Sequence, residues 1–111
     1  MATQVAVLIA AKQAENVQTT QYTSTGVKTI IDKFTGTNTS AAAATLSINL
    51  IPSAGVAGNG NLIVKTKSLL PGETYIFPEI VGQVLDVNGF ISTIAGAAGA
   101  ITITAHGRQV A

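Results

Sequence analysis

The sequence predicts a single all-β domain over residues 1–111, a two-sheet β-sandwich of about eight short strands. Three observations support this prediction. Val, Ile and Thr, which are favoured in pleated sheet, make up 37 of the 111 residues. Apolar and polar residues alternate in one segment after another. Turn residues interrupt this alternation at intervals of roughly ten residues, as in all-β domains.

Seven segments are expected to form strands, and an eighth candidate lies near the start. Gly, Asn or Pro separates most of the segments where the backbone must reverse. The eighth candidate, residues 5–11, could instead begin a short helix through Asn16, because Ala, Lys, Gln and Glu favour helix. Residues 1–16 are thus an edge strand, a helix or an N-terminal arm. The seven expected strands are residues 17–23, 27–37, 45–51, 62–67, 73–77, 90–95 and 101–107.

The alternation also predicts which side chains face the interior. The predicted core stripes are Leu46, Ile48 and Leu50 in one strand and Ile101, Ile103 and Ala105 in another. The alternate residues of the same two strands are expected on the opposite, polar side. Ser47, Asn49 and His106 are among them. Residues 78–84 are expected to form a single helical turn or a loop. The topology stays open between jelly-roll and immunoglobulin-like, because alternation does not define strand order.

The chain is unusually poor in charge. Charged residues make up 10% of the sequence, against about 25% in ordinary globular domains, and residues 34–64 contain none. The formal net charge is +1, so a free monomer would lack the surface charge that keeps separate molecules from associating. Partners are therefore expected to cover much of the protein surface. Nucleic acid is not an expected partner, because phosphate binding requires clustered Lys and Arg. Lys65 and Lys67 are expected on the solvated face of one strand.

Several classes of site have no support in the sequence. Cysteine is absent, which excludes disulfides, thiolate nucleophiles and cysteine-ligated metals. His106 is the single histidine, with no second ligand at metal-binding spacing and no serine or acid placed to make it a general base, so a surface or interface histidine is expected. No segment approaches the roughly 20 apolar residues of a membrane span, and no basic residue precedes the first apolar run. We expect a soluble chain without a secretory signal, metal or cofactor.

Three of the five acidic residues, Glu73, Glu79 and Asp86, lie in the segment "PGETYIFPEIVGQVLDVNGF". A catalytic pair of carboxylates would need two acids in tuned environments and a substrate-positioning group beside them. Steps of six and seven residues across a proline-containing loop fix no such geometry. "PGE" is a turn signal that precedes a strand. The three residues are therefore expected to be loop or partner-facing carboxylates, and no catalytic residue is predicted.

Three short motifs have structural explanations. "GNGN" at residues 58–61 precedes a strand rather than a helix, so it is expected to be a hairpin turn and not a phosphate-binding loop. "NTS" at residues 38–40 matches a glycosylation pattern but is expected to be an Asn-containing turn that ends a strand. "AAAA" at residues 41–44 offers either a close approach for another surface or a flat packing face inside the sandwich.

Three segments together resemble a family of small virion proteins of tailed bacteriophages. The pattern is a strand ending in "TNTS", an apolar strand, "PGETY", an apolar loop, "GFIS", and a final strand that closes on Gly107 and Arg108. The similarity covers residues 17–110, and the N-terminal segment has no strong counterpart in it. The resemblance implies a capsid decoration protein, also called cement or staple protein, that is β-rich and dimeric. It also implies binding to the outside of an icosahedral capsid, tying major capsid subunits together, with no active-site residues.

We therefore expect a non-enzymatic structural virion protein, made in the host bacterial cytoplasm and placed on the outer capsid surface. Its expected partners are the phage major capsid protein and a second copy of itself as a homodimer. A tail or head–tail connector component is one alternative. A ligand-binding β-sandwich is another, although such modules display aromatic side chains on an open face. Most of the aromatic residues here are expected in the core or in turns: Tyr22, Phe34, Tyr75, Phe77 and Phe90.

Two apolar segments are expected to form unguarded strand edges. Residues 5–11 contain no charge before Lys12, and the hairpin of residues 45–51 and 62–64 contains none before Lys65. Unpaired N–H and C=O groups at such edges recruit other chains, and monomeric proteins usually place Lys or Pro there. We expect one of these two segments to be covered by another subunit in the assembled particle.

Overall fold

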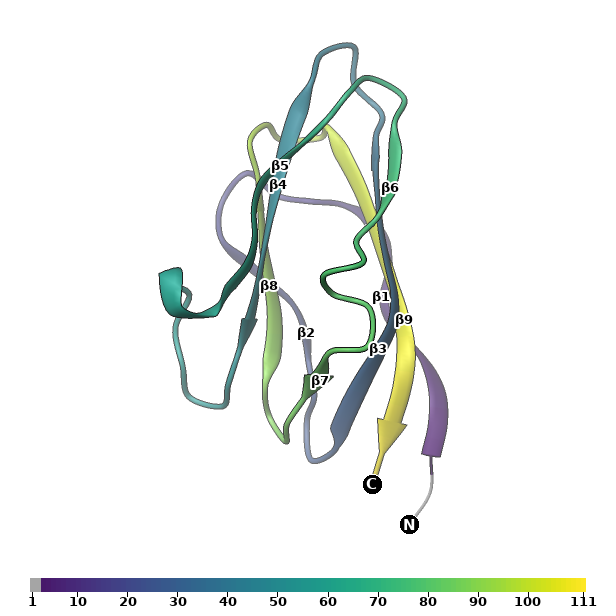
Figure 1. Cartoon of the computed structure of the whole chain (residues 1–111), viewed down its shortest axis with the longest axis vertical. Coiled ribbons are helices and arrows are strands. Elements are labelled where there is room, and N and C mark those ends of the chain that lie inside the picture. The colour runs from purple at the N-terminus through teal and green to yellow at the C-terminus, as the bar shows by residue number, and fades with distance from the viewer. Residues whose placement is uncertain (1–2) are drawn as a thin grey trace.

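The computed structural model describes residues 3–111 as two antiparallel sheets that face each other (Figure 1). A short 3₁₀ turn, η1 (Asn59–Asn61), lies in the connection between two strands of the second sheet. The first sheet contains β1 (Thr3–Gln13), β9 (Ile101–Val110), β3 (Lys28–Asn38), β6 (Thr74–Ile76) and β7 (Val84–Leu85). The second sheet contains β2 (Thr19–Thr23), β8 (Phe90–Ala95), β4 (Ala44–Ile51) and β5 (Leu62–Leu69). The predicted all-β sandwich is confirmed.

The strand order decides between the two topologies. One sheet has the order β1-β9-β3-β6, with β7 also pairing with β3, and the other has the order β2-β8-β4-β5. If β6 and β7 count as one interrupted strand, the orders are first-eighth-third-sixth and second-seventh-fourth-fifth, the arrangement of a jelly roll. An immunoglobulin-like sandwich would instead place the first two strands side by side in one sheet. Here β1 and β2 belong to different sheets, and β1 pairs with the last strand.

The core lies between the two sheets. Phe34 and Phe77 have no exposed surface and meet edge to face, with 5.5 Å between their ring centres. Full burial of an aliphatic or aromatic side chain stabilises the fold by roughly 1.5–3 kcal/mol. Leu50, at the end of its predicted stripe, is only half-buried. The other predicted core residues are buried: Leu46, Ile48, Ile101, Ile103 and Ala105.

Residues 3–13 form a strand and not a helix. β1 pairs with β9 from Thr3 opposite Val110 to Gln13 opposite Thr102, so pairing rather than helix propensity decides its conformation. Residues 1 and 2 lie outside the described residues. The segment after β6 makes the predicted single turn, because the N–H of Val81 donates to the carbonyl oxygen of Phe77 at 3.3 Å. β7 was not predicted, since two residues are too few to show alternation.

β4 is covered on both faces, which contradicts one prediction. Ser47 and Asn49 were expected on a solvated side, but their exposed fractions are 7% and 3%. β4 is an inner strand between β8 and β5, and the β4–β5 loop lies against its polar side. Asn49 Nδ2 donates to the carbonyl oxygen of Gly58 at 3.2 Å and to Asn61 Oδ1 at 2.7 Å. Asn49 Oδ1 accepts from Gln18 Nε2 at 3.2 Å. Protein groups therefore replace water on this side.

A β-bulge in β5 separates the two lysines that were expected on one face. The register of β5 against β4 shifts here, so Lys65 and Thr66 together oppose Ser47. Thr66 has φ 47°, a left-handed conformation that β-branched residues rarely adopt, and its N–H donates to Ser47 Oγ at 2.8 Å. Lys67 consequently turns toward the other sheet, with its Nζ 4.4 Å from the ring centre of Tyr75. The prediction of a shared solvated face is wrong.

Candidate binding surface

The three carboxylates of residues 71–90 each have a separate partner. Glu73 Oε1 accepts the N–H of Leu70 at 2.8 Å and closes the predicted turn. Glu79 Oε2 lies 3.5 Å from the hydroxyl of Tyr75, which donates to it. Asp86 Oδ1 lies 3.5 Å from Lys28 Nζ in an exposed ion pair. No hydrogen bond joins any two of these acids, so they do not form a pair.

His106 lies exposed on the outer face of β9, between Val7 of β1 and Lys33 of β3. Its Nε2 is 3.3 Å from the hydroxyl oxygen of Thr104, and no carboxylate is hydrogen-bonded to the ring. The predicted surface histidine is therefore found at the surface. Within residues 3–111, no group of three or more His, Cys, Asp or Glu side chains is arranged to hold a metal ion.

The short motifs form turns. Asn38 is fully buried at the end of β3, and its Nδ2 donates to the carbonyl oxygens of Ala42 and Leu69 at 2.8 and 2.9 Å. "NTS" is thus the strand-ending turn that was predicted. Residues 58–61 lie in the β4–β5 hairpin connection, as predicted, with η1 inside it. Of the four consecutive alanines, Ala44 is buried, whereas residues 41–43 are exposed.

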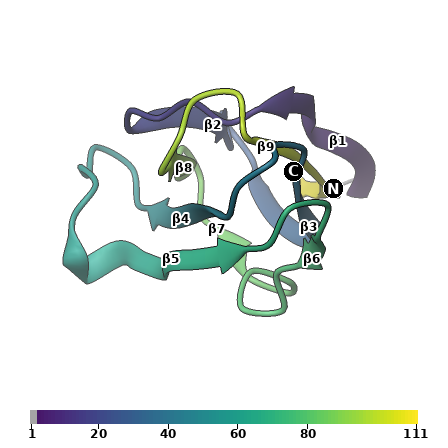
Figure 2. The same ribbon diagram turned by 90° about the horizontal axis from the view of Figure 1, so that it is seen from above.

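β1 is one of the sheet edges of residues 3–111, and β6, β2 and β5 form the others. β1 hydrogen-bonds to β9 on one side, and no strand of residues 3–111 pairs with its other side. Seen from above, β1 curls away at the side of the molecule (Figure 2). Val5 and Val7 have exposed fractions of 86% and 61%. β1 therefore presents unpaired backbone groups beside exposed apolar side chains, and its one charged residue, Lys12, lies near its far end.

A shallow hollow of about 320 Å³ adjoins this edge on the outer side of the five-stranded sheet. We call its lining the β1 face: Val5, Ala6, Val7, Asp32, His106 and Gly107. Arg108 donates to both carboxylate oxygens of Asp32, from Nη2 to Oδ1 at 2.9 Å and from Nε to Oδ2 at 3.0 Å and to Oδ1 at 3.2 Å. Asp32 in turn raises the pKa of Arg108. These two charges offset each other, and exposed Lys33, opposite His106 in β3, adds a positive charge beside the β1 face.

The other predicted edge is guarded. Residues 45–51 form the inner strand β4, so the free edge of that hairpin is β5. β5 carries a charge at Lys65 and a second at Lys67, and these disfavour pairing with another strand; β1 and β5 both have register irregularities, so charge is the difference between them. Residues 5–11 therefore lie in an edge strand, as expected, whereas residues 45–51 do not, and the edge strand β5 is without charge only before Lys65.

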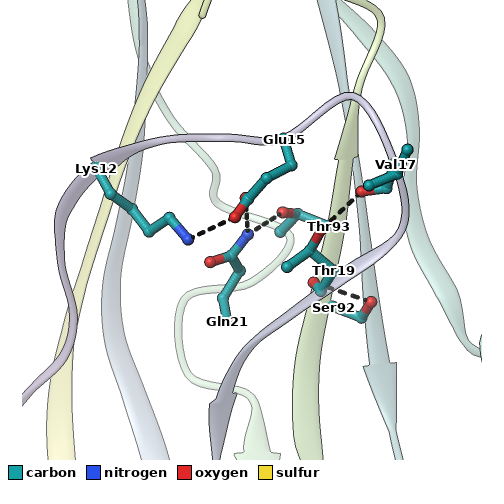
Figure 3. Close-up of polar contacts among 7 residues, drawn as sticks. All are labelled: Lys12, Glu15, Val17, Thr19, Gln21, Ser92 and Thr93. Atoms are coloured by element: carbon teal, nitrogen blue, oxygen red, sulfur yellow. Dashed lines mark hydrogen bonds and ion pairs between the residues drawn. The ribbon is translucent and has the colours of Figure 1, made fainter. Parts of the chain in front are cut away.

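A polar cluster that the sequence analysis missed pins the connection from β1 to β2 (Figure 3). Glu15 Oε2 accepts from Lys12 Nζ at 2.9 Å, and its Oε1 accepts from Gln21 Nε2, also at 2.9 Å. Gln21 Nε2 also donates to Thr93 Oγ1 at 3.0 Å in β8. The hydrogen bonds from Lys12 and Gln21 lower the pKa of Glu15 to about 2. In the sequence, only the spacing of Lys12 and Glu15 pointed to this cluster. Gln21 and Thr93 are distant in sequence and reach it because the fold brings β2 and β8 beside the connection.

Comparison of the chain with protein-family models, with curated proteins and with solved structures finds no match. The candidate surface therefore rests on the residues and geometry described above.

Proposed function

We propose that this chain is a non-enzymatic structural protein that binds the outside of an icosahedral phage capsid and bridges neighbouring major capsid subunits. The resemblance of residues 17–110 to phage decoration proteins suggested this role. The low charge supports it, because a surface with few charges is suited to lying against other subunits. The jelly roll is compatible with the role but does not argue for it, since one fold serves many functions.

The observation that carries the proposal is the open, charge-poor edge of β1 beside the β1 face. An extended segment of a neighbouring subunit can add to such an edge through main-chain hydrogen bonds, while side chains such as Val5 and Val7 pack against it. A single contact of this kind is modest. Icosahedral symmetry repeats it many times, and bridging two subunits makes the second contact effectively intramolecular.

Two lysine substitutions at equally exposed valines test this surface. Val7 lies on the β1 face and Val17 lies in the β1–β2 loop, and both have an exposed fraction of 61%. Val7→Lys should weaken binding to particles that lack the protein by roughly 2 kcal/mol or more, because it places an unpaired charge in the contact. Val17→Lys should bind as the parent does.

Both variants should keep the β-type circular dichroism of the parent, since neither side chain is buried. Equal binding by Val7→Lys and the parent would rule out the β1 face as the contact. Ala6 and Ser47 would be poorer test sites. Ala6 packs partly against the core, and Ser47 is buried and accepts the N–H of Thr66 in β5.

Copy number distinguishes the proposed role from a tail or connector role. A decoration protein should be present in purified virions in near-stoichiometric ratio to the major capsid protein, whereas a connector should be present in a few copies. The ligand-binding alternative gains no support from the aromatic residues. All five are buried or half-buried, so none offers an open stacking platform: Tyr22, Phe34, Tyr75, Phe77 and Phe90.

A further inference from the structure

The sequence contains the dipeptide Asn-Gly twice, at Asn59–Gly60 and at Asn88–Gly89. Asn-Gly is the dipeptide most prone to spontaneous deamidation. The backbone nitrogen of the glycine can attack the side-chain carbonyl carbon of the asparagine, and glycine has no side chain to hinder the approach. The reaction requires that nitrogen to be free and the local backbone to rearrange. The surroundings of the two sites therefore decide whether either one reacts.

Asn88–Gly89 is held on every side. The nucleophilic nitrogen of Gly89 already donates to the carbonyl oxygen of Asp86 at 2.9 Å, and Gly89 is buried. The N–H of Asn88 donates to the carbonyl oxygen of Ser24 at 2.7 Å. Asn88 Oδ1 accepts the N–H of Gly26 at 3.1 Å, which fixes the side chain away from its own backbone. Attack at this site would break several hydrogen bonds at once.

Asn59–Gly60 lies in the open. Both residues are exposed in the β4–β5 loop, and a side-chain carbon placed on Gly60 would meet nothing within 4 Å. Within residues 3–111, the Gly60 nitrogen and the Asn59 side chain make no hydrogen bond. The loop is instead anchored one residue later, where Asn61 Oδ1 accepts from Asn49 at 2.7 Å. The turn η1 is closed around the dipeptide by the N–H of Asn61, which donates to the carbonyl oxygen of Gly58 at 3.2 Å, so rearrangement of the dipeptide disturbs this turn bond.

We propose that Asn59–Gly60 is a self-modification site at which the folded protein deamidates. The Gly60 nitrogen bonds to Asn59 Cγ, the bond from Cγ to the side-chain amide nitrogen breaks, and ammonia leaves with the proton lost by Gly60. The product is a five-membered cyclic imide. Water then opens either carbonyl of that imide and gives aspartate or isoaspartate at position 59. The net reaction consumes one water and releases one ammonia, and it needs no enzyme or cofactor.

The modification changes the charge of the region that is poorest in charge. Residues 34–64 contain no charged side chain, so the new carboxylate would be the first, and the formal net charge would change from +1 to 0. Asn59 and Lys65 line the same hollow of about 240 Å³ on the outer side of the four-stranded sheet. A carboxylate at position 59 therefore has a cation near it. This inference is independent of the proposed capsid role.

Incubation of the folded full-length chain at mildly alkaline pH, followed by peptide mapping, tests the proposal. Conversion of Asn to Asp or isoaspartate raises the mass of the peptide, and isoaspartyl methyltransferase labels the isoaspartate. We expect Asn59 to convert at least roughly tenfold faster than Asn88, because the opening required at Asn59 is local and breaks fewer hydrogen bonds. The same chain unfolded in urea should convert both sites at similar rates.

The proposal is overturned if Asn59 stays unmodified in the folded chain while the unfolded chain reacts, or if folded Asn59 and Asn88 convert at equal rates. Gly60→Ala provides a second test, since the space around Gly60 accommodates a methyl group. This variant should keep the parent's circular dichroism and lose most of the labelling at position 59. Unchanged labelling at that position in a folded Gly60→Ala chain would exclude attack by the residue 60 nitrogen.

Discussion

At the scale of the residue, Gly107 shows how one missing side chain supports the pairing of three strands. Gly107 lies in β9 opposite Ala6 of β1 and Ile31 of β3. A side-chain carbon at this position would collide with the carbonyl oxygen of Ile30 and lie 2.9 Å from Leu8 Cδ1. Glycine is needed here for space, because a backbone carbonyl cannot move aside without disturbing the pairing of β3 with β9.

Gly107→Ala should therefore lower the free energy of unfolding by about 2–3 kcal/mol, the upper part of the range for overpacking. Urea unfolding followed by circular dichroism measures the change. Gly58→Ala is the matched control, because a side-chain carbon there meets nothing within 4 Å, and it should change stability by less than about 0.5 kcal/mol. Equal stability of the Gly107→Ala variant and the parent would show that β3 yields at this point.

The burial of a residue was predicted correctly where it depends on one strand alone. It was predicted wrongly where another segment of the chain covers that strand. Leu46 and Ile48 were predicted in the core and are buried, because alternation places them on the inner side of β4. Ser47 and Asn49 were predicted in solvent and are buried, because the β4–β5 loop bonds to the other side. Alternation shows which residues share a face, but it does not show what covers that face.

At the scale of the element, the strands were predictable and their irregularities were not. Residues 62–67 were predicted as one regular strand, yet the bulge at Lys65 and Thr66 reverses the orientation of Lys67. Its strained conformation at Thr66 is held by the hydrogen bond to Ser47, a residue of the neighbouring strand. Such a bulge depends on pairing across strands, so no pattern within β5 alone could predict it.

The connection from β1 to β2 should be weakened by acid. The pKa of Glu15 falls from 4.5 to about 2 on folding, so the protonated side chain is disfavoured in the folded state. The stabilisation is fully present above pH 4.5 and is lost as the pH falls toward 2. The Glu15 side chain is 38% exposed, so solvent screening limits this contribution to about 1 kcal/mol or less.

Urea unfolding of the parent and of Glu15→Gln across this pH range measures the contribution of Glu15. Other carboxylates also titrate in this range, so the informative quantity is the difference between the two chains. Glu15→Gln should be less stable than the parent at neutral pH, and the gap should close as the pH approaches 2. A gap that is independent of pH would show that the Glu15 carboxylate is not stabilised by its neighbours.

At the scale of the whole molecule, topology lay beyond what the sequence could predict. β1 pairs with β9, so residues such as Thr3 and Val110 meet from opposite ends of the chain, and nothing local encodes that meeting. The candidate surface could be predicted only in part, because strand order is not encoded locally. The lack of charge in residues 5–11 can be seen in the sequence, but whether a strand is an edge depends on the order of the sheet. β1 proved to be an edge, and residues 45–51 did not.

The free edge of β1 also offers a surface for self-association. The free edge of β1 has no charge before Lys12, so two copies can pair there in antiparallel fashion without like charges meeting near the centre. We expect the parent chain to sediment as at least a dimer at micromolar concentration. Val7→Lys should shift it toward monomer, because the twofold axis brings the two new charges close together. Val17→Lys should leave the parent's sedimentation unchanged.

Together with particle binding, sedimentation identifies the subunit that covers β1. A parent dimer that Val7→Lys dissociates assigns the edge to a second copy of this chain. A monomeric parent would show that the dimer expectation is wrong; if Val7→Lys still weakened particle binding, the edge would belong to a capsid subunit. A dimer that survives Val7→Lys unchanged would place the contact elsewhere. Val7 is 61% exposed in the single chain, and a lysine charge at this position is tolerated only where no partner covers it.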